Sequence, residues 1–216
     1  SPVLADFIAD SFNMTDTERD TYEIEEHPFA PFLPENARVL ILGSFPPQRK
    51  RWSMEFYYPN RSNDFWKIIG LLFFGDERHF LIGEGRKFDE MTIRNFCTEK
   101  GIAMYDTACK VRRLKDNASD KYLEVVETSD IPSLLKTIPL CKGIVTTGEK
   151  ATRTISDILE CDAPAMNGSS VVRDVDGHGR EVTLFRLPST SRAYPMPLKD
   201  KAECYRSMFV RIGMLR

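Results

Sequence analysis

Four short apolar segments constrain this chain more than any other feature of its sequence. They span residues 38–43, 101–106, 143–148 and 182–187. Each is short and rich in aliphatic residues, which is typical of strands buried on both faces of a sheet. Segments with helical periodicity follow them, at residues 64–73, 89–99, 131–137, 150–159 and 198–212. Strands that alternate with helices at this spacing predict an α/β domain with a parallel sheet covered on both faces.

Two further segments lie outside this alternation. Residues 1–22 are rich in Asp, Thr, Glu and Asn and lack a strong period. We expect them to form an acidic arm, with a short helix at residues 4–12, ahead of an α/β domain at residues 23–216. Between residues 174 and 180, the Asp-Gly and His-Gly pairs favour positive φ and predict a hairpin tip. The hairpin would join antiparallel strands at residues 170–173 and 181–185.

The charge distribution and the cysteines limit the classes of ligand. The formal net charge is −2, but residues 1–30 hold eight acidic residues against one arginine, so the other 186 residues carry +5. A basic body can bind a polyanion despite the overall charge. The five cysteines are widely spaced without a Cys-x-x-Cys pair, so we expect reduced thiols and no zinc or iron–sulfur site. No apolar run approaches the ~18 residues of a membrane span, and we expect no secretion leader.

Ligands of open α/β sheets bind at the carboxyl ends of the strands, so the segments after each strand are informative. Ser44-Phe-Pro-Pro47 follows the first strand, and its prolines withhold two N–H groups from any phosphate. The sequence contains neither G-x-x-x-x-G-K-[ST] nor G-x-G-x-x-G, which excludes the usual ATP and dinucleotide motifs. The segment Gln48–Trp52 then combines three cations with an aromatic residue. Such a cluster is either a solvated face or a binding patch.

Aromatic and amide side chains precede the first helix of the predicted domain. Tyr57 and Tyr58 either cover the edge of the sheet or, in the case of Tyr58, provide a stacking platform for a base. We expect Ser62 to cap the helix, which would place Asn63 in its first turn and facing the ligand edge. Asn63 is then a candidate catalytic residue or merely part of the helix start.

Segments after the other strands supply further candidates. Four cations lie within Lys110–Lys115, where they either contact phosphates or form a solvated face. Thr146, Thr147 and Lys150 either touch a base or phosphate or begin a helix. The segment Leu187–Pro195 is rich in hydroxyl groups, which suit phosphate oxygens, and its exposed residues could wedge into a duplex.

Three polar residues elsewhere are expected to have structural roles. Asp106 ends the second strand, where a carboxylate could orient a water molecule, but we expect it to cap a loop. His27 and His178 have no partner visible in the sequence, so we expect each to be exposed or satisfied by its surroundings.

Three of these segments together resemble the signatures of the uracil-DNA glycosylase superfamily. They are Gly43–Pro46 after the first strand, Tyr58–Trp66 leading into a helix, and Leu187–Ser191 after the last strand. The similarity runs from about Glu23 to Arg211 and is nearest to the mismatch-specific uracil/thymine and the hypoxanthine-DNA glycosylase branches. It implies a three-layer sandwich with a central four-stranded parallel sheet. It also implies that a damaged base is flipped into a pocket and released without a metal or cofactor.

The resemblance also suggests roles for individual residues. Tyr58 matches the aromatic residue that stacks on the flipped base, and Asn63 matches the catalytic asparagine of the hypoxanthine branch. Ser44 and Phe45 match the pocket wall, and we add Thr147 to the predicted base pocket. The predicted DNA-binding residues are Arg49, Lys50, Arg51, Lys110, Arg112, Arg113, Ser189, Thr190, Ser191 and Arg192.

Departures from the family pattern define the alternatives. Apolar Phe45 occupies the place of the water-activating Asp or Asn of the strong uracil enzymes, and Leu187 that of their His or Asn. In addition, Pro47 replaces a common glycine, and Gln48–Arg51 is a basic insertion. The hypoxanthine branch tolerates similar losses.

Three functions therefore remain open. The first is a monomeric, cytoplasmic DNA glycosylase of bacterial, nucleoid-associated type that removes uracil, hypoxanthine or a mismatched base. The second is a catalytically weak or inactive nucleic-acid-binding module on the same fold. The third is an enzyme that hydrolyses free nucleosides or nucleotides, although no dedicated phosphate loop supports it. We further expect the acidic arm to compete with DNA for the basic groove.

Overall fold

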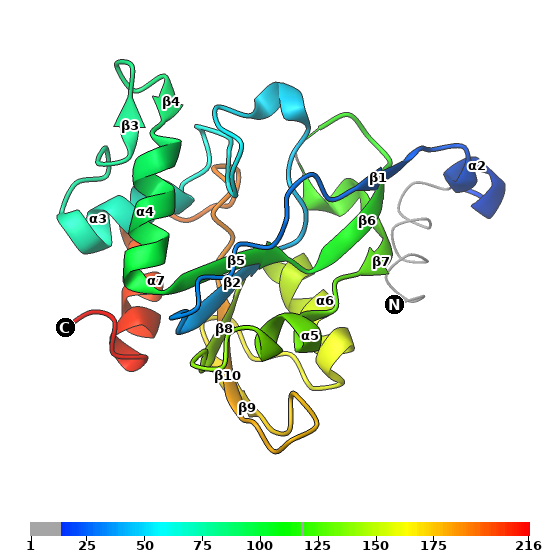
Figure 1. Ribbon diagram of the computed structural model, residues 1–216. Helices are drawn as coiled ribbons and strands as arrows, with labels where there is room; N and C mark the ends of the chain where they lie inside the picture. Colours follow the sequence, from blue (N-terminus) through cyan, green and yellow to red (C-terminus); the bar gives the residue numbers. More distant parts are fainter. Residues whose placement is uncertain (1–13, 118) are drawn as a thin grey trace.

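A five-stranded sheet forms the centre of the computed structural model, which describes residues 14–117 and 119–216 (Figure 1). Its strands are β2 (Val39–Gly43), β5 (Ile102–Asp106), β8 (Gly143–Thr147), β9 (Ser169–Val172) and β10 (Val182–Leu187), in the spatial order β5-β2-β8-β10-β9. Strands β5, β2, β8 and β10 pair in parallel. Strand β9 pairs antiparallel to β10 through the predicted hairpin. The predicted α/β class is confirmed, with an antiparallel fifth strand at one edge of the four parallel strands.

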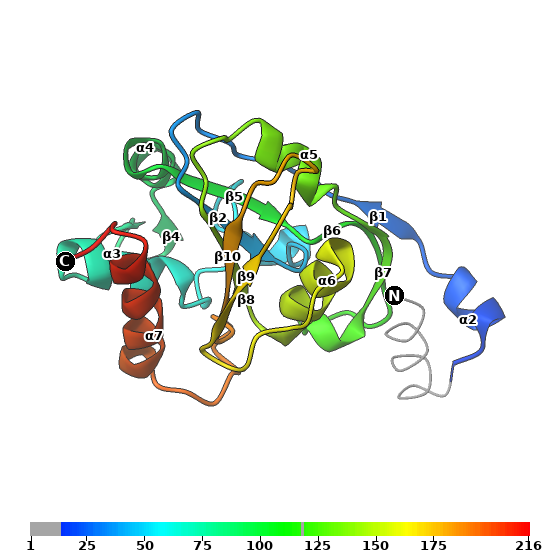
Figure 2. The ribbon, with the colours of Figure 1, turned by 90° about the horizontal axis from the view of Figure 1, so that it is seen from below.

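Helices cover both faces of this sheet, so the molecule has the predicted three layers (Figure 2). One face carries α3 (Phe65–Phe74), α4 (Glu90–Lys100) and α7 (Leu198–Arg211), and the other carries α5 (Ile131–Lys136) and α6 (Glu149–Leu159). Successive strand residues pack on opposite faces. Ile41 belongs to the same buried core as Trp66 of α3, whereas Leu40 belongs to the core that contains Ile155 of α6. This alternation explains why each strand is apolar throughout its length.

A second, antiparallel sheet was not predicted from the sequence. It has the order β1-β6-β7 and consists of β1 (Ile24–Glu26), β6 (Ala108–Arg113) and β7 (Leu123–Thr128). The basic cluster after the second predicted strand is thus itself a strand. Val111 of β6 and Leu123 of β7 are buried against Phe45, which explains the pairing of these strands.

Short elements complete the described chain. In the acidic arm, α2 (Asp16–Asp20) begins with a capping box between Thr15 and Glu18. The helix expected at residues 4–12 lies outside the described residues. The remaining elements are the two-residue strands β3 (Leu81–Ile82) and β4 (Lys87–Phe88) and the 3₁₀ helices η1 (Arg49–Arg51) and η2 (Asp120–Tyr122). Within the described chain, no helix is long and apolar enough to cross a membrane.

Candidate functional site at the strand ends

Polar side chains meet at the carboxyl ends of β2, β5 and β8. A Cβ atom added to Gly43, the last residue of β2, would lie 2.7 Å from Asp106 Oδ1, 3.3 Å from Tyr58 Oη and 3.7 Å from Thr147 Oγ1. Three oxygens from three segments therefore converge on the one position of β2 that lacks a side chain. We call Ser44, Tyr58, Asp106, Asp120 and Thr147 the strand-end cluster.

Tyr58 is held at this site by contacts on its ring and on its hydroxyl group. Its hydroxyl oxygen lies 2.6 Å from Thr147 Oγ1, and its ring stacks on Phe65 with centroids 4.1 Å apart. The backbone of Tyr58 adopts a positive φ of 54°, which is uncommon for a bulky residue and is found at constrained sites. Burial raises the pKa of Tyr58. Tyr57, by contrast, lies in the core, and its hydroxyl group donates a hydrogen bond to the Ala30 carbonyl.

Asp106 forms a buried pair with His27. His27 is thus satisfied by its surroundings, which is one of the two alternatives expected for it, whereas the expectation that the Asp106 side chain caps a loop is wrong. His27 Nε2 lies 2.7 Å from Asp106 Oδ2, and both side chains are more than nine-tenths buried. The Phe29 backbone N–H donates to His27 Nδ1 at 3.0 Å. The two residues are 79 positions apart in the chain, and His27 follows β1, which the sequence did not predict. Asp106 was identifiable only as a polar residue at a strand end.

The other predicted pocket residues, Ser44 and Phe45, are buried directly after β2. The ring of Phe45 packs edge-on against His27, with centroids 5.3 Å apart. Ser44 hydrogen-bonds to Asp120, a carboxyl group from η2 that sequence reasoning did not identify, and burial raises the pKa of Asp120. Within the described residues, no group of three or more His, Cys, Asp or Glu side chains is arranged to hold a metal ion.

Asn63 lies at the start of α3, but not as expected. Ser62 does not cap the helix, because its hydroxyl donates to Asn60 Oδ1. Instead, Asn63 Oδ1 accepts the Phe65 backbone N–H at 2.9 Å and so satisfies one donor of the first turn. Its side-chain oxygen already accepts this hydrogen bond, and among the described residues its NH₂ group has no partner, so that group is available to a ligand.

A buried lysine ties the loop after β10 to the start of α3. Lys201 Nζ donates to Asp64 Oδ2 at 3.0 Å and to the Ser191 carbonyl at 2.9 Å. The Asp64 backbone N–H donates to the Thr190 carbonyl. Thr190 is buried, Ser189 is half-buried, and Ser191 and Arg192 are exposed. The loop therefore presents its serines and Arg192, rather than Thr190, to solvent.

The first basic cluster is exposed beside the strand ends. Arg49 lies over the ring of Trp52, 4.4 Å from its centroid, and pairs with Glu55 at 2.9 Å. Lys50 pairs with Asp116 at 2.8 Å, and Arg51 Nε donates to the side-chain oxygen of Gln48. Exposed ion pairs of this kind contribute little, about 0–1 kcal/mol, so a phosphate group can replace the carboxylate partner at small cost.

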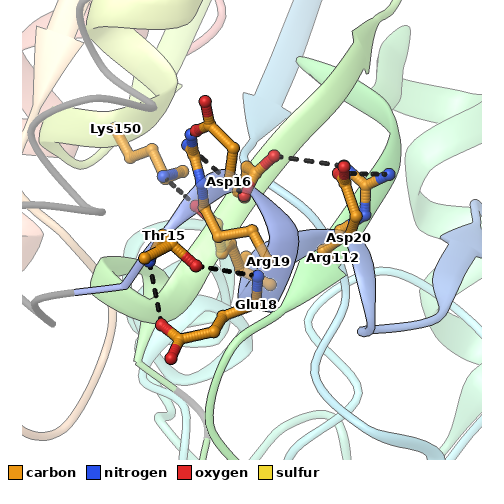
Figure 3. A network of polar contacts seen from close by, with 9 residues as sticks. Thr15, Asp16, Glu18, Arg19, Asp20, Arg112 and Lys150 are labelled. Atoms are coloured by element: carbon orange, nitrogen blue, oxygen red, sulfur yellow. Dashed lines mark hydrogen bonds and ion pairs between the residues drawn. The ribbon is translucent and has the colours of Figure 1, made fainter.

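The second basic cluster, on β6, faces acidic residues of the chain itself. Figure 3 shows Arg112 beside α2, where it lies 3.7 Å from Asp20. Arg112 also pairs with Glu124 of β7 at 3.2 Å, and Arg19 of α2 lies 3.8 Å from the other oxygen of Glu124.

Strand β1 supplies acidic partners for the other two cations. Arg113 pairs with Glu25 at 3.0 Å and donates to the Pro46 carbonyl, and Lys110 lies 3.9 Å from Glu26. The arm and β1 therefore occupy the cations that the sequence predicted to bind DNA.

Thr146, near the end of β8, and Lys150, in the first turn of α6, each bond to a partner within the protein. Thr146 is buried and hydrogen-bonds to Thr152, which turns it away from the strand-end cluster. Lys150 Nζ donates to the Leu123 carbonyl at 2.5 Å. Burial lowers the pKa of Lys150 to about 8.

No protein-family model and no curated protein sequence matches this chain. Its fold matches the solution NMR structure of "a putative Uracil DNA glycosylase" from Methanosarcina acetivorans, with a TM-score of 0.57 and 19% sequence identity. The match covers 88% of this chain and 99% of that one. At this level of identity the similarity is one of fold. The chain thus has the α/β fold of a uracil-DNA glycosylase-like structure over most of its length.

Proposed function

We propose that this protein is a DNA glycosylase that flips a deaminated or mismatched base, such as uracil or hypoxanthine, and hydrolyses its N-glycosidic bond. The observation that carries this proposal is the convergence of Tyr58, Asp106 and Thr147 on Gly43 at the carboxyl ends of the sheet. Ligands of open α/β sheets bind at this edge. The similarity of the fold to a uracil-DNA glycosylase-like structure supports the same reading.

The predicted pocket residues have complementary tasks in this reaction. Ser44, Phe45, Tyr58 and Thr147 bind the flipped base through an aromatic ring, hydroxyl groups and the backbone after β2. Asn63 donates a hydrogen bond from its free NH₂ group to the leaving base, since its oxygen is held by Phe65. A fixed donor stabilises the negative charge that develops on the base as the bond breaks.

DNA is held by the groups around this edge. Arg49 and Lys50 exchange their exposed carboxylate partners for phosphates, and Arg51 exchanges its amide partner Gln48. Ser189, Ser191 and Arg192 contact the backbone or fill the gap left by the flipped base. Thr190 supports this loop from inside. Lys110, Arg112 and Arg113 join the interface when the acidic arm and β1 give way.

The test is single-turnover cleavage of labelled duplexes that each contain one uracil, hypoxanthine, xanthine or mismatched thymine. We expect alkali-labile sites with at least one substrate and their loss in Asn63→Ala. Asn36→Ala is the matched control, because Asn36 is exposed and precedes β2 at the opposite edge of the sheet. Cleavage that persists unchanged in Asn63→Ala would remove Asn63 from the chemistry.

A non-catalytic nucleic-acid-binding module is the second candidate function. Phe45 and Leu187, at the positions where strong uracil enzymes carry polar groups, are both buried and apolar. Salt-sensitive DNA binding without release of any base would favour this module over the enzyme.

A further inference from the structure

The buried pair of Asp106 and His27 is the least expected feature of the strand-end cluster. Asp106 ends β5, and His27 reaches it from the segment after β1, where the His27 backbone N–H donates to the Cys109 carbonyl of β6. Because the Phe29 N–H donates to His27 Nδ1, the proton of the neutral imidazole is on Nε2. His27 therefore donates to Asp106 Oδ2 and fixes the orientation of the carboxylate.

This arrangement leaves the second oxygen of Asp106 directed at the candidate site. Across residues 14–117 and 119–216, no hydrogen bond is made to Asp106 Oδ1. That atom lies against the Cα of Gly43, where a Cβ would approach it to 2.7 Å, and near the hydroxyl groups of Tyr58 and Thr147. Only glycine at position 43 allows the carboxylate so close to the end of β2.

Hydrolysis of an N-glycosidic bond needs a group that accepts a proton from the attacking water. Asn63 cannot be that group, because an amide is not a base and its oxygen already accepts the Phe65 N–H. Phe45, at the position of the usual carboxylate, has no polar side-chain atom. Asp120 is engaged by the Ser44 hydroxyl group, whereas Asp106 Oδ1 is the carboxylate oxygen that converges with Tyr58 and Thr147 on Gly43.

We propose that Asp106 is the catalytic carboxylate of this protein and that His27 is its positioning residue. This inference rests on the proposed glycosylase function. The bond between C1′ and the base breaks, and its electron pair leaves with the base, which then takes a proton from solvent. A water oxygen bonds to C1′, and its proton passes to Asp106 Oδ1 and from there to solvent. The negative charge of Asp106 also stabilises the cationic sugar between these two events.

The principal test compares Asp106→Asn with the unmutated protein in single-turnover cleavage of its best substrate across a range of pH. We expect the rate to fall by about 10²–10⁴-fold at every pH tested. The titratable groups that face Asp106 are His27, Tyr57, Tyr58, Tyr105 and Asp120, and all remain in this variant. Asp176→Asn, the same change in the β9–β10 hairpin tip, is the matched control and keeps full activity.

Two further variants distinguish chemistry from folding. His27→Gln retains an N–H donor for Oδ2 and should keep more activity than His27→Leu at equal DNA affinity. Gly43→Ala displaces Oδ1 without removing it and should lower the rate, whereas Gly143→Ala should not, because its Cβ meets nothing closer than 3.6 Å. Each variant is checked for the native circular dichroism spectrum before its rate is interpreted.

The outcomes separate this inference from the function on which it rests. If the unmutated protein and Asp106→Asn release the base at equal rates, the role of Asp106 is overturned and the glycosylase stands. A change in which base is released, without loss of rate, would also overturn it, because Asp106 would then contact the base and not the water. If the unmutated protein releases no base, both proposals fall together.

Discussion

Replacing Lys201 with methionine isolates the contribution of the buried ion pair beneath the loop after β10. The residue is fully buried, and its ammonium group contacts Asp64 Oδ2 and the Ser191 carbonyl. Methionine has a similar length but no charge. The variant therefore leaves the Asp64 carboxylate, only 12% of whose side chain is exposed, without its cationic partner.

The expected loss of stability is large for a single substitution. Removing one partner of a buried ion pair costs about 3–5 kcal/mol, because an uncompensated charge remains in the interior. Since Asp64 keeps slight exposure, we expect the lower end of that range. In a domain of this size each kcal/mol lowers Tm by about 2–4 °C, so the melting temperature should fall by about 6–12 °C. Urea unfolding and thermal unfolding at neutral pH measure the two quantities.

Two companion variants decide how the result is read. Lys199→Met makes the same change at an exposed position of α7 and should alter the free energy of unfolding by less than about 0.5 kcal/mol. Adding Asp64→Asn to Lys201→Met removes the unpaired charge and should recover part of the loss. Equal stability of Lys201→Met and Lys199→Met would refute the reasoning, because Asp64 would then not depend on its partner.

Further predictions concern the arm, Lys150 and Tyr58. Deleting residues 1–22 changes the formal net charge from −2 to +2 and should tighten DNA binding, with the salt slope steeper by about 0.9 for each phosphate newly contacted; unchanged affinity and slope would contradict this. Burial lowers the pKa of Lys150 from 10.5 to about 8. Between pH 8 and pH 10.5 this amine is therefore protonated in the unfolded state and neutral in the folded state, so the free energy of unfolding rises with pH across that window. Urea unfolding near pH 7 and near pH 10 should show this rise relative to Lys150→Met. Tyr58→Phe removes the contact with Thr147 and should lower the unfolding free energy by about 1 kcal/mol, with the exposed Tyr22→Phe as control.

The central sheet was predictable because its strands carry their signal locally. The runs at residues 38–43 and 143–148 are apolar on both faces and end in glycine, and β2 and β8 lie within those limits. The predicted hairpin is present as well, because Asp174 and Gly177 both adopt positive φ. Each of these signals depends only on neighbouring residues.

The small sheet and the Asp106–His27 pair escaped prediction for a common physical reason. In β6 the buried Ala108 and Val111 are three residues apart, because a register shift beside Lys110 interrupts the pairing with β7, so the segment lacks the two-residue period typical of a strand and its cations suggest a phosphate-binding cluster instead. Once β6 is missed, β1 has no strand to pair with, and nothing directs His27 toward Asp106. The pair thus depends on long-range pairing that single segments do not encode. The prediction that Ser62 caps the helix is wrong because its hydroxyl group donates to Asn60 Oδ1, while Asn63 Oδ1 accepts the Phe65 N–H.

Strand β1 links the surface charge to the interior of the site. Its Glu25 and Glu26 neutralise Arg113 and Lys110, while the next residue, His27, holds the Asp106 carboxylate. Three consecutive residues therefore connect the cations of β6 to the buried Asp106 carboxylate. Peeling β1 away from β6 would uncover two cations and release the carboxylate in the same movement. A polyanion that displaced Glu25 and Glu26 from the cations of β6 would therefore also change the position of the Asp106 carboxylate.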